Sequence, residues 1–428
     1  MHHKNNRSKT GSVVFYITVA LLTVGIAAMA SLPYIMSRSG RNAVAGNYSG
    51  EYPRNGDGVD QFGRPSSDFD EMRGVWVAYL SLNGVNRELI DTIVSSAKAN
   101  GMNTIFLHVR PFGDALYQSD YYPWSHLVTG TQGQAPEDGF DPLAYAVEAA
   151  HREGMYLHAW LNPLRIMLPS GTYPPSLSDD NPYNVWRNDD MADNDDWVID
   201  YKSGKFYNPA VPQVRELIVN GTREIVERYN VDGVHWDDYF YPAYDETFDD
   251  GKAYAAYKEQ GGSLGLSDWR RQNINELVKA VYSAVKSADS QCLFGISPAG
   301  NIDNCMSAGA DVKTWGSTEG YVDYLIPQVY WTSDNTVAPF EPVCRQWNEL
   351  VKSPGVKLYI GLALYKAGSD DDKGKWKKAD DIIMNQVLYT RSGEIKSEGF
   401  VLYSYAYFDS EQTAEEMKNL RSVLVAQD

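Results

Sequence analysis

The feature that most constrains the fold of this chain is an alternation of short apolar segments with longer amphipathic ones, which begins at residue 72. Such alternation favours a parallel sheet whose strands are joined by crossover helices. The predicted strands are 73–79, 104–110, 155–162, 233–239, 292–297, 324–331, 357–365 and 400–408. The predicted helices are 87–100, 142–153, 211–229, 268–288, 340–351, 380–391 and 411–425. The pattern predicts an α/β fold, a (β/α)8 TIM barrel with long βα-loop insertions, the longest at 165–206.

Three parts are expected along the 428 residues. In 1–36, basic residues precede an uncharged apolar run at 13–30, which predicts a hydrophobic helix that is a signal peptide or a membrane anchor. Residues 37–71 are rich in Gly, Ser, Asn, Asp and Arg and are expected to be a flexible linker. Residues 72–428 should form the barrel in an extracytoplasmic compartment, the periplasm or cell envelope, because the basic flank stays in the cytoplasm.

Composition excludes some partners and favours others. The net charge of −18 argues against nucleic acid, whose phosphates need a basic face. The 30 tyrosines and 11 tryptophans suit either a Tyr-rich core or the stacking of sugar rings. The three cysteines have no zinc-binding spacing, and Cys305 and Cys344 can pair only if the fold brings them together.

Strand 233–239 ends in two adjacent carboxylates, Asp237 and Asp238, among aromatic residues. Active sites of (β/α)8 barrels lie at the carboxyl ends of the strands. Two carboxylates in a confined site repel, so the pKa of one should be raised, which lets an acid and a base coexist near neutral pH. We therefore expect Asp237 and Asp238 to be catalytic, and Asp114, on the loop after the second strand, is a further candidate.

Residue parity predicts which side chains share the barrel mouth with Asp237. The residues that should point inward with it are His108, Arg110, His158, Trp160, Asn162, His235, Tyr239, Gln328, Tyr330, Tyr403, Tyr405 and Tyr407. Tyr330 is a further catalytic candidate. The expected substrate-binding residues are Arg110, Trp124, Trp160, Asn162, Arg165, Tyr239, Gln328, Trp331 and Tyr365.

Three histidines on neighbouring strands, His108, His158 and His235, are the main argument for a metal site. No strand carries a His-x-His pair, and no glutamate lies at the same mouth. We therefore expect these histidines to fill the barrel, and we predict no metal or cofactor.

Nine motifs in consistent order resemble the bacterial glycosyl hydrolase-like 10 family over about 72–410. They are Met72-Arg-Gly-Val-Trp76, the run from His108 to Tyr117, Pro123-Trp-Ser125 with Thr129-Gly130, Phe140-Asp-Pro-Leu143, the run from His158 to Arg165, the run from Val231 to Tyr241, Ile296-Ser-Pro-Ala-Gly300, the run from Pro327 to Trp331, and Leu358-Tyr-Ile-Gly361. The resemblance implies an exported barrel protein. It also implies hydrolysis of denuded peptidoglycan glycans, with cell-division proteins as partners. Two positions depart from the pattern. Asn208 stands where many relatives carry Asp before Pro, and Phe112 occupies a position that is variable and sometimes acidic in relatives.

The segment 232–237 and Gln328-Val-Tyr330 also resemble the acidic strand and the Gln-x-Tyr of family-18 chitinases, although Tyr239 stands at the position of their acid. In those enzymes the substrate N-acetyl group is the nucleophile. The sequence thus predicts an exported glycosidase that cleaves an N-acetylated glycan by carboxylate or substrate-assisted catalysis. Two alternatives stay open, a non-catalytic glycan-binding barrel and a metal-dependent deacetylase or amidohydrolase.

Overall fold

A computed structural model describes residues 64, 70–191, 193–242 and 247–425 of the chain. Contacts divide the chain into two units, 1–50 and 51–428, and every described residue belongs to the second. The predicted hydrophobic helix at 13–30 and nearly all of the predicted linker lie outside the described residues. Within the described part, no helix is both long and apolar enough to span a membrane.

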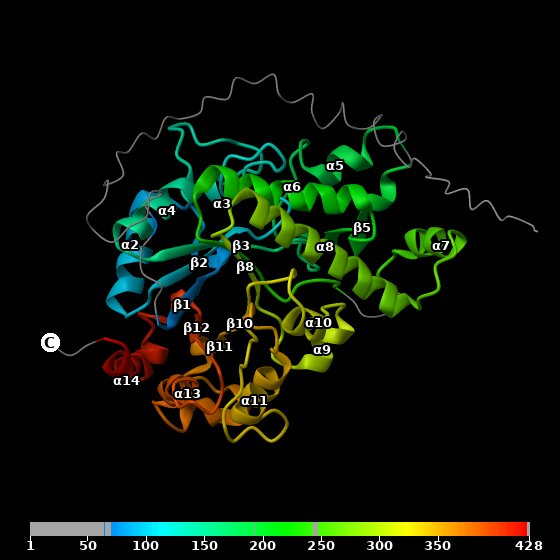
Figure 1. Cartoon of the computed structure of the whole chain (residues 1–428). Helices are drawn as coiled ribbons and strands as arrows, with labels where there is room; N and C mark the ends of the chain where they lie inside the picture. The colour runs from blue at the N-terminus through cyan, green and yellow to red at the C-terminus, as the bar shows by residue number, and fades with distance from the viewer. Residues whose placement is uncertain (1–63, 65–69, 192, 243–246, 426–428) are drawn as a thin grey trace, which may run out of the picture. The chain divides into compact units, whose positions relative to one another are not determined.

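The main sheet is parallel and closes into a barrel (Figure 1). Around the sheet the strand order is β10-β9-β8-β7-β3-β2-β1-β12-β11. Since only Tyr359 separates β10 from β11, these two form one strand, which pairs with β9 on one side and β12 on the other. The strands are β1 (Met72–Val77), β2 (Thr104–Arg110), β3 (Tyr156–Leu161), β7 (Gly233–Trp236), β8 (Leu293–Ile296), β9 (Tyr324–Leu325), β10 (Lys357–Leu358), β11 (Ile360–Leu362) and β12 (Gly399–Tyr403). The predicted (β/α)8 barrel is confirmed.

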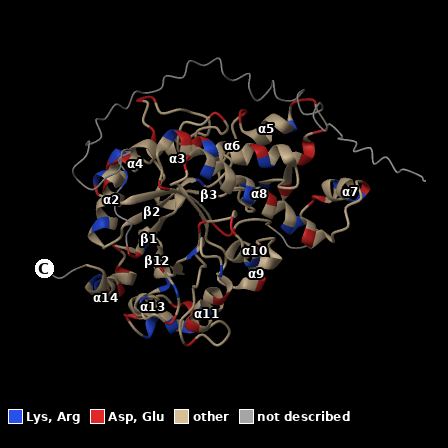
Figure 2. Cartoon of the chain, in the orientation of Figure 1, with Lys and Arg blue, Asp and Glu red and all other residues tan. Residues whose placement is uncertain are grey.

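Helices surround the barrel, with α6 and α8 packed side by side (Figure 1). Side-chain caps fix the residue at which several of these helices begin. The Asn86 side chain accepts a hydrogen bond from the Leu89 amide, and the Asp141 side chain accepts one from the Ala144 amide. The helices are α2 (Arg87–Ala99), α3 (His126–Thr129), α4 (Pro142–Arg152), α5 (Pro182–Arg187), α6 (Pro212–Tyr229), α7 (Gly251–Glu259), α8 (Leu266–Ala288), α9 (Ile302–Ser307), α10 (Val312–Ser317), α11 (Phe340–Leu350), α12 (Asp371–Gly374), α13 (Ile382–Thr390) and α14 (Ala414–Leu424). Lysine, arginine, aspartate and glutamate gather on these helices and their loops rather than on the strands (Figure 2).

The structure departs from the predicted elements in three places. Strand 324–331 is reduced to β9, because the chain leaves the ladder at Pro327 and pairs again only through isolated bridges at Gln328. The last strand ends at Tyr403, and Tyr405–Tyr407 is a 3-10 turn. The alternation of inward and outward side chains that was predicted for Tyr405 and Tyr407 therefore stops at Tyr403. The 165–206 insertion contains an antiparallel sheet of β4 (Arg165–Met167), β6 (Gly204–Tyr207) and β5 (Val198–Tyr201).

The apolar core has two layers. One fills the barrel interior, and the other lies between the strands and the helices. The interior layer comprises Met72, Trp76, Ala78, Phe106, Trp160, Tyr324, Ile326, Tyr359 and Val401. This packed interior fills the barrel below its carboxyl end, where the loops that follow the strands form the mouth.

Replacing Gly295 with alanine should destabilise the barrel. A Cβ at Gly295 would lie 2.0 Å from the Tyr324 ring, whose hydroxyl bonds Nδ1 of His158 at 2.9 Å. Overpacking of this kind costs about 1–3 kcal/mol, which urea unfolding would measure. Gly265→Ala is the matched control, because a Cβ there meets no atom within 4 Å. Equal stabilities of the two variants would contradict the packing argument.

Candidate active site

Asp237 follows β7 directly and is held by side chains from the end of β3. Its Oδ1 accepts from Asn162 Nδ2 at 3.0 Å, and its Oδ2 accepts from Trp160 Nε1 at 3.2 Å. The Tyr239 amide also donates to Oδ1, at 3.3 Å. Asp237 is only 3% exposed, and Asn162 is fully buried. Trp160, Asn162 and Asp237 therefore lie together, as residue parity predicted.

Burial raises the pKa of Asp237 to about 6. The positive charge of Arg165 lowers this pKa, and the neighbouring Asp238 carboxylate raises it. Burial also raises the pKa of Asp238, which a hydrogen bond from the Gln328 side chain opposes. The two carboxylates therefore differ in their hydrogen-bond partners. Asp237 accepts from side chains at the end of β3, whereas Asp238 accepts from the Gln328 side chain. A group with a pKa near 6 can hold or release a proton close to neutral pH.

Arg165, at the start of β4, lies beside these carboxylates. Its Nε donates to the Pro111 carbonyl at 3.1 Å, and its own amide donates to Asn162 Oδ1. The guanidinium carbon lies 5.1 Å from the Phe112 ring centroid and 4.8 Å from that of Tyr239. The guanidinium is thus held in place by one carbonyl and two rings. Phe112 is fully buried beneath it, so at this departure from the family pattern a ring supports the cation.

Three tyrosines, Tyr330, Tyr365 and Tyr403, form an aromatic wall on or after strands β9, β11 and β12. The ring of Tyr330 lies 5.9 Å from that of Tyr365 and 6.2 Å from that of Tyr403. Burial keeps the pKa of Tyr330 well above its usual value, and the Asp238 charge adds to the shift, so its hydroxyl stays protonated. Tyr239 is 56% exposed, with a ring available to a ligand. Gln328 donates to the Ser297 carbonyl at 3.1 Å, close to the same wall.

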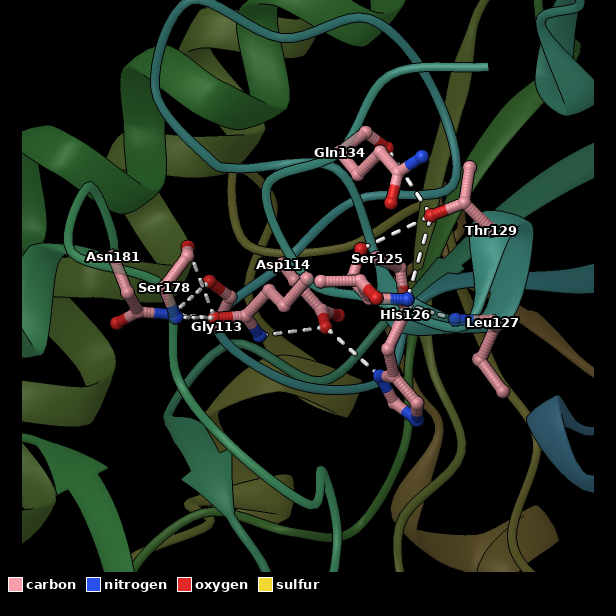
Figure 3. A network of polar contacts seen from close by, with 11 residues as sticks. Gly113, Asp114, Ser125, His126, Leu127, Thr129, Gln134, Ser178 and Asn181 are labelled. Carbon is pink, nitrogen blue, oxygen red and sulfur yellow. Dashed lines mark hydrogen bonds and ion pairs between the residues drawn. The ribbon is translucent and has the colours of Figure 1, made fainter. Parts of the chain in front are cut away.

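Asp114 belongs to a separate polar network in the loop after β2 (Figure 3). Its Oδ2 accepts from Gln132 Nε2 at 2.8 Å and lies 3.4 Å from His126 Nδ1. Gln132 Oε1 in turn accepts from Asn181 Nδ2 at 3.2 Å. Asp114 is fully buried, and its contacts with Gln132 and His126 lie within the loops and do not reach Asp237. The structure therefore places this candidate in loop support.

Arg110 does not point into the barrel, contrary to the parity prediction. A β-bulge follows His108: His108 pairs with Trp160, but Arg110 pairs with Leu161, which faces the outer layer. The bulge turns Arg110 outward, where its guanidinium carbon lies 4.5 Å from the Tyr122 ring centroid.

Among the other expected stacking residues, Trp124 is half-buried in the loop after β2 and Trp331 packs against Gly300.

The three barrel histidines are core groups. His158 and His235 both contact the Tyr324 hydroxyl, at 2.9 and 3.3 Å, and His108 stacks on Trp160 at 3.7 Å. Burial lowers the pKa of all three, so they are neutral. Among the described residues no group of three or more His, Cys, Asp or Glu side chains is arranged to hold a metal.

The three cysteines are free, so Cys305 and Cys344 do not pair.

Sequence reasoning missed part of the mouth. Tyr79 follows β1, and its ring lies 5.1 Å from Phe112 and 5.7 Å from Tyr173. Lys366 donates to the Tyr330 carbonyl at 3.2 Å. Tyr79 is the last residue of the predicted strand 73–79, which was an available signal, whereas Tyr173 comes from the insertion and carried none. The Asn208 side chain is buried, and its Nδ2 donates to the Asp196 carbonyl, so this hydrogen bond ties Asn208 to the insertion.

The family model described as glycosyl hydrolase-like 10 matches residues 71–379. The chain belongs to the glycosyl hydrolase-like 10 family. It is 34% identical to the glycosyl hydrolase YngK of Bacillus subtilis over 76% of this chain and 66% of the relative, just under two thirds of its length. It is 30% identical to the glycosyl hydrolase DigH of Escherichia coli K12 over 82% of this chain and 87% of that one.

Solved structures show the same fold at low identity. The glycoside hydrolase domain of PgaB (BpsB) from Bordetella bronchiseptica superposes with a TM-score of 0.53 at 16% identity, over 84% of this chain and all of that one. The catalytic domain of β-amylase from Paenibacillus polymyxa superposes with a TM-score of 0.52 at 12% identity, over 83% of this chain and 99% of that one. These likenesses establish the barrel that this glycosyl hydrolase-like 10 member shares with glycosidases.

Proposed function

We propose that this protein is a glycoside hydrolase that cleaves an N-acetylated glycan, namely peptide-free peptidoglycan strands. The observation that carries the proposal is the buried Asp237 carboxyl, fixed by Asn162 and Trp160 at the carboxyl end of the strands, with a pKa raised to about 6. A positioned carboxyl that titrates near neutral pH can act as a general acid or base. Membership of the family supports the reaction class.

The neighbouring groups suit a substrate-assisted route. In that route the N-acetyl oxygen attacks the anomeric carbon, the bond to the leaving sugar breaks, and the leaving oxygen takes a proton. Asp237 gives that proton or, ionised, orients the N-acetyl group. Asp238 raises the pKa of Asp237, and Gln328 hydrogen-bonds Asp238. The Tyr330 hydroxyl, kept protonated by burial, donates to the reacting sugar.

Arg165 is the group that would distinguish peptidoglycan from a neutral glycan. N-acetylmuramic acid carries a lactyl carboxylate, and arginine binds carboxylates with two parallel hydrogen bonds. The only hydrogen bond from the Arg165 side chain among the described residues uses Nε, and both terminal amino groups are therefore left for a ligand. Tyr239, Trp331 and Tyr365 would supply stacking surfaces.

Action on wall glycans requires the protein to lie outside the cytoplasm. The apolar run at 13–30 supports export, either as a cleaved signal or as a membrane tether. The notion that cell-division proteins are its partners rests on the family resemblance alone.

The direct test incubates the full-length protein with amidase-stripped peptidoglycan glycans and follows products by liquid chromatography and mass spectrometry. Short oligosaccharides are expected. Binding of the same glycans without any product would instead favour a non-catalytic glycan-binding barrel. One observation favours that second candidate: Tyr239 stands where family-18 chitinases have their acid.

Arg165→Met should weaken turnover of the muramic acid-containing glycan selectively. Loss of a carboxylate-binding arginine should raise KM by about 10-fold or more, since a charged hydrogen bond contributes about 1.5–3 kcal/mol. Turnover of a neutral N-acetylglucosamine oligomer by the same variant is the internal control and should keep its KM. Because Arg165 lowers the pKa of Asp237, the ionisation in the pH profile should also move upward. Equal losses on both glycans would refute the carboxylate role.

A further inference from the structure

Arg110 is a buried arginine whose guanidinium has no hydrogen-bond or ion-pair partner among the described residues. The structure buries four arginines among the described residues, Arg64, Arg110, Arg165 and Arg270. Arg64 pairs with Asp289 at 2.5 Å, Arg270 pairs with Asp250 at 2.7 Å, and Arg165 bonds a carbonyl. Arg110 is 1% exposed, and none of its three guanidinium nitrogens has a hydrogen-bond partner among the described residues.

An unpaired guanidinium at this depth needs a counter-charge. Arginine stays protonated in proteins, and burial of an isolated charge is strongly unfavourable. The Tyr122 ring, 4.5 Å from the guanidinium carbon, supplies a cation–π contact but no net negative charge. All the N–H donors of the guanidinium remain available to an acceptor.

Three buried tyrosine hydroxyls, those of Tyr117, Tyr122 and Tyr207, also lack hydrogen-bond partners among the described residues. The charge of Arg110 acts on all three, since it lowers each pKa against the larger effect of burial, which raises it. They come from the loop after β2 and from the end of β6. Tyr122 is pressed against α6 at Gly221, where a Cβ would meet its ring at 2.5 Å. The Tyr122 ring thus contacts both Arg110 and α6, and burial keeps all three hydroxyls protonated.

Two of the carboxylates whose charges act on these tyrosines have other partners within the chain. Glu224, whose charge acts on Tyr117, accepts from the Ser119 hydroxyl and the Asp120 amide and pairs with Arg228 at 2.8 Å. Asp114, whose charge acts on Tyr207, accepts through Oδ2 from Gln132. Oδ1 of Asp114 has no partner, which makes Asp114 the rival counter-charge, acting through water. Neither carboxylate forms an ion pair with Arg110.

We propose that Arg110 and the hydroxyls of Tyr117, Tyr122 and Tyr207 bind a small inorganic anion of the size and charge of chloride. Such an ion accepts several N–H and O–H hydrogen bonds at once and neutralises the guanidinium. The site is outside the barrel wall and separate from the glycan-binding mouth. Its anion would stabilise the segment that supports the mouth, because the next two residues, Pro111 and Phe112, are the ones that contact Arg165.

The experiment measures thermal unfolding of the full-length protein while sodium chloride or bromide replaces sodium gluconate at constant ionic strength. A ligand that binds only the folded state raises the midpoint, here by on the order of 2 °C. Arg110→Met should lose this rise. Arg270→Met is the matched control, because that arginine has its carboxylate within the chain, and it should keep the rise. Crystals of the wild type grown with bromide should show an anomalous peak beside Arg110.

Three results would overturn the proposal. The first is a wild-type midpoint that does not depend on halide. The second is a halide response that Arg110→Met retains, since the ion would then bind elsewhere. The third is the absence of a bromide peak, with ordered water joining Arg110 to Asp114; in that case Asp114→Asn should create a halide dependence that the wild type lacks. The wild-type crystal decides the question even if Arg110→Met does not fold.

Discussion

Asp237→Asn is expected to reduce kcat/KM on amidase-stripped peptidoglycan glycans by about 10²–10⁴-fold, the usual contribution of general acid–base catalysis. Asparagine keeps the size of the side chain but can neither give nor take the proton. In the wild type, the pH profile of kcat/KM should show an ionisation near pH 6, where burial has raised the pKa of Asp237. If Asp237 acts protonated, kcat/KM falls above this pH; if it acts ionised, kcat/KM falls below it. In either case the variant should lack this ionisation.

The exposed Asp91, on α2 outside the barrel, provides a control variant, Asp91→Asn, which should retain full activity. Asp238→Asn should have a smaller effect on the rate and should lower the apparent pKa of Asp237, because the Asp238 charge raises it. Circular dichroism would verify the fold of each variant. A folded Asp237→Asn protein with wild-type turnover would remove Asp237 from the chemistry.

The stability difference between the wild type and Asp237→Asn should depend on pH. The folded state raises the pKa of Asp237 from 3.8 to about 6, so it holds the proton more tightly than the unfolded state does. The contribution of the protonated carboxyl is therefore fully present below pH 3.8 and is lost as the pH rises through 6. The shift corresponds to about 3 kcal/mol. Urea unfolding from pH 4 to 7 should show the free energy of unfolding of the wild type falling by most of that amount relative to the variant.

Asp289→Asn is the control of opposite sign for this series. Hydrogen bonds and the charge of Arg64 hold the pKa of Asp289 below its usual value, against the opposing effect of burial. The wild type should therefore gain stability relative to Asp289→Asn as the pH rises. A pH-independent difference for Asp237→Asn would mean that its carboxyl has an ordinary pKa and is not poised for proton transfer.

Much of the site followed from period-2 alternation along strands that keep their register. Trp160, Asn162 and Asp237 were expected to face one another because β3 and β7 are regular, and in the structure they share hydrogen bonds. Gln328 and Tyr330 also reach the mouth, although their strand is broken after Leu325. The family and the barrel class were likewise predictable, since many ordered motifs and a repeated strand–helix pattern carry them.

The position of Arg110 could not be predicted in the same way. One extra residue in a strand reverses the direction of every side chain after it, and nothing in the sequence around His108 marks that bulge. Tyr405 and Tyr407 are a second case, because the chain turns into a 3-10 helix where the alternation was expected to continue. The partners of Asp114 come from loops up to residue 181 and depend on how those loops pack.

The sequence by itself determined the barrel and the set of polar groups at its carboxyl end, because apolar periodicity and strand–helix order are local properties. Only the tertiary structure decided which carboxyl is hydrogen-bonded from the end of β3, which arginine supports the mouth, and which arginine is buried behind it. Desolvation and hydrogen bonding depend on atoms brought together from distant parts of the chain. These properties are therefore set by packing and not by the residues that carry them.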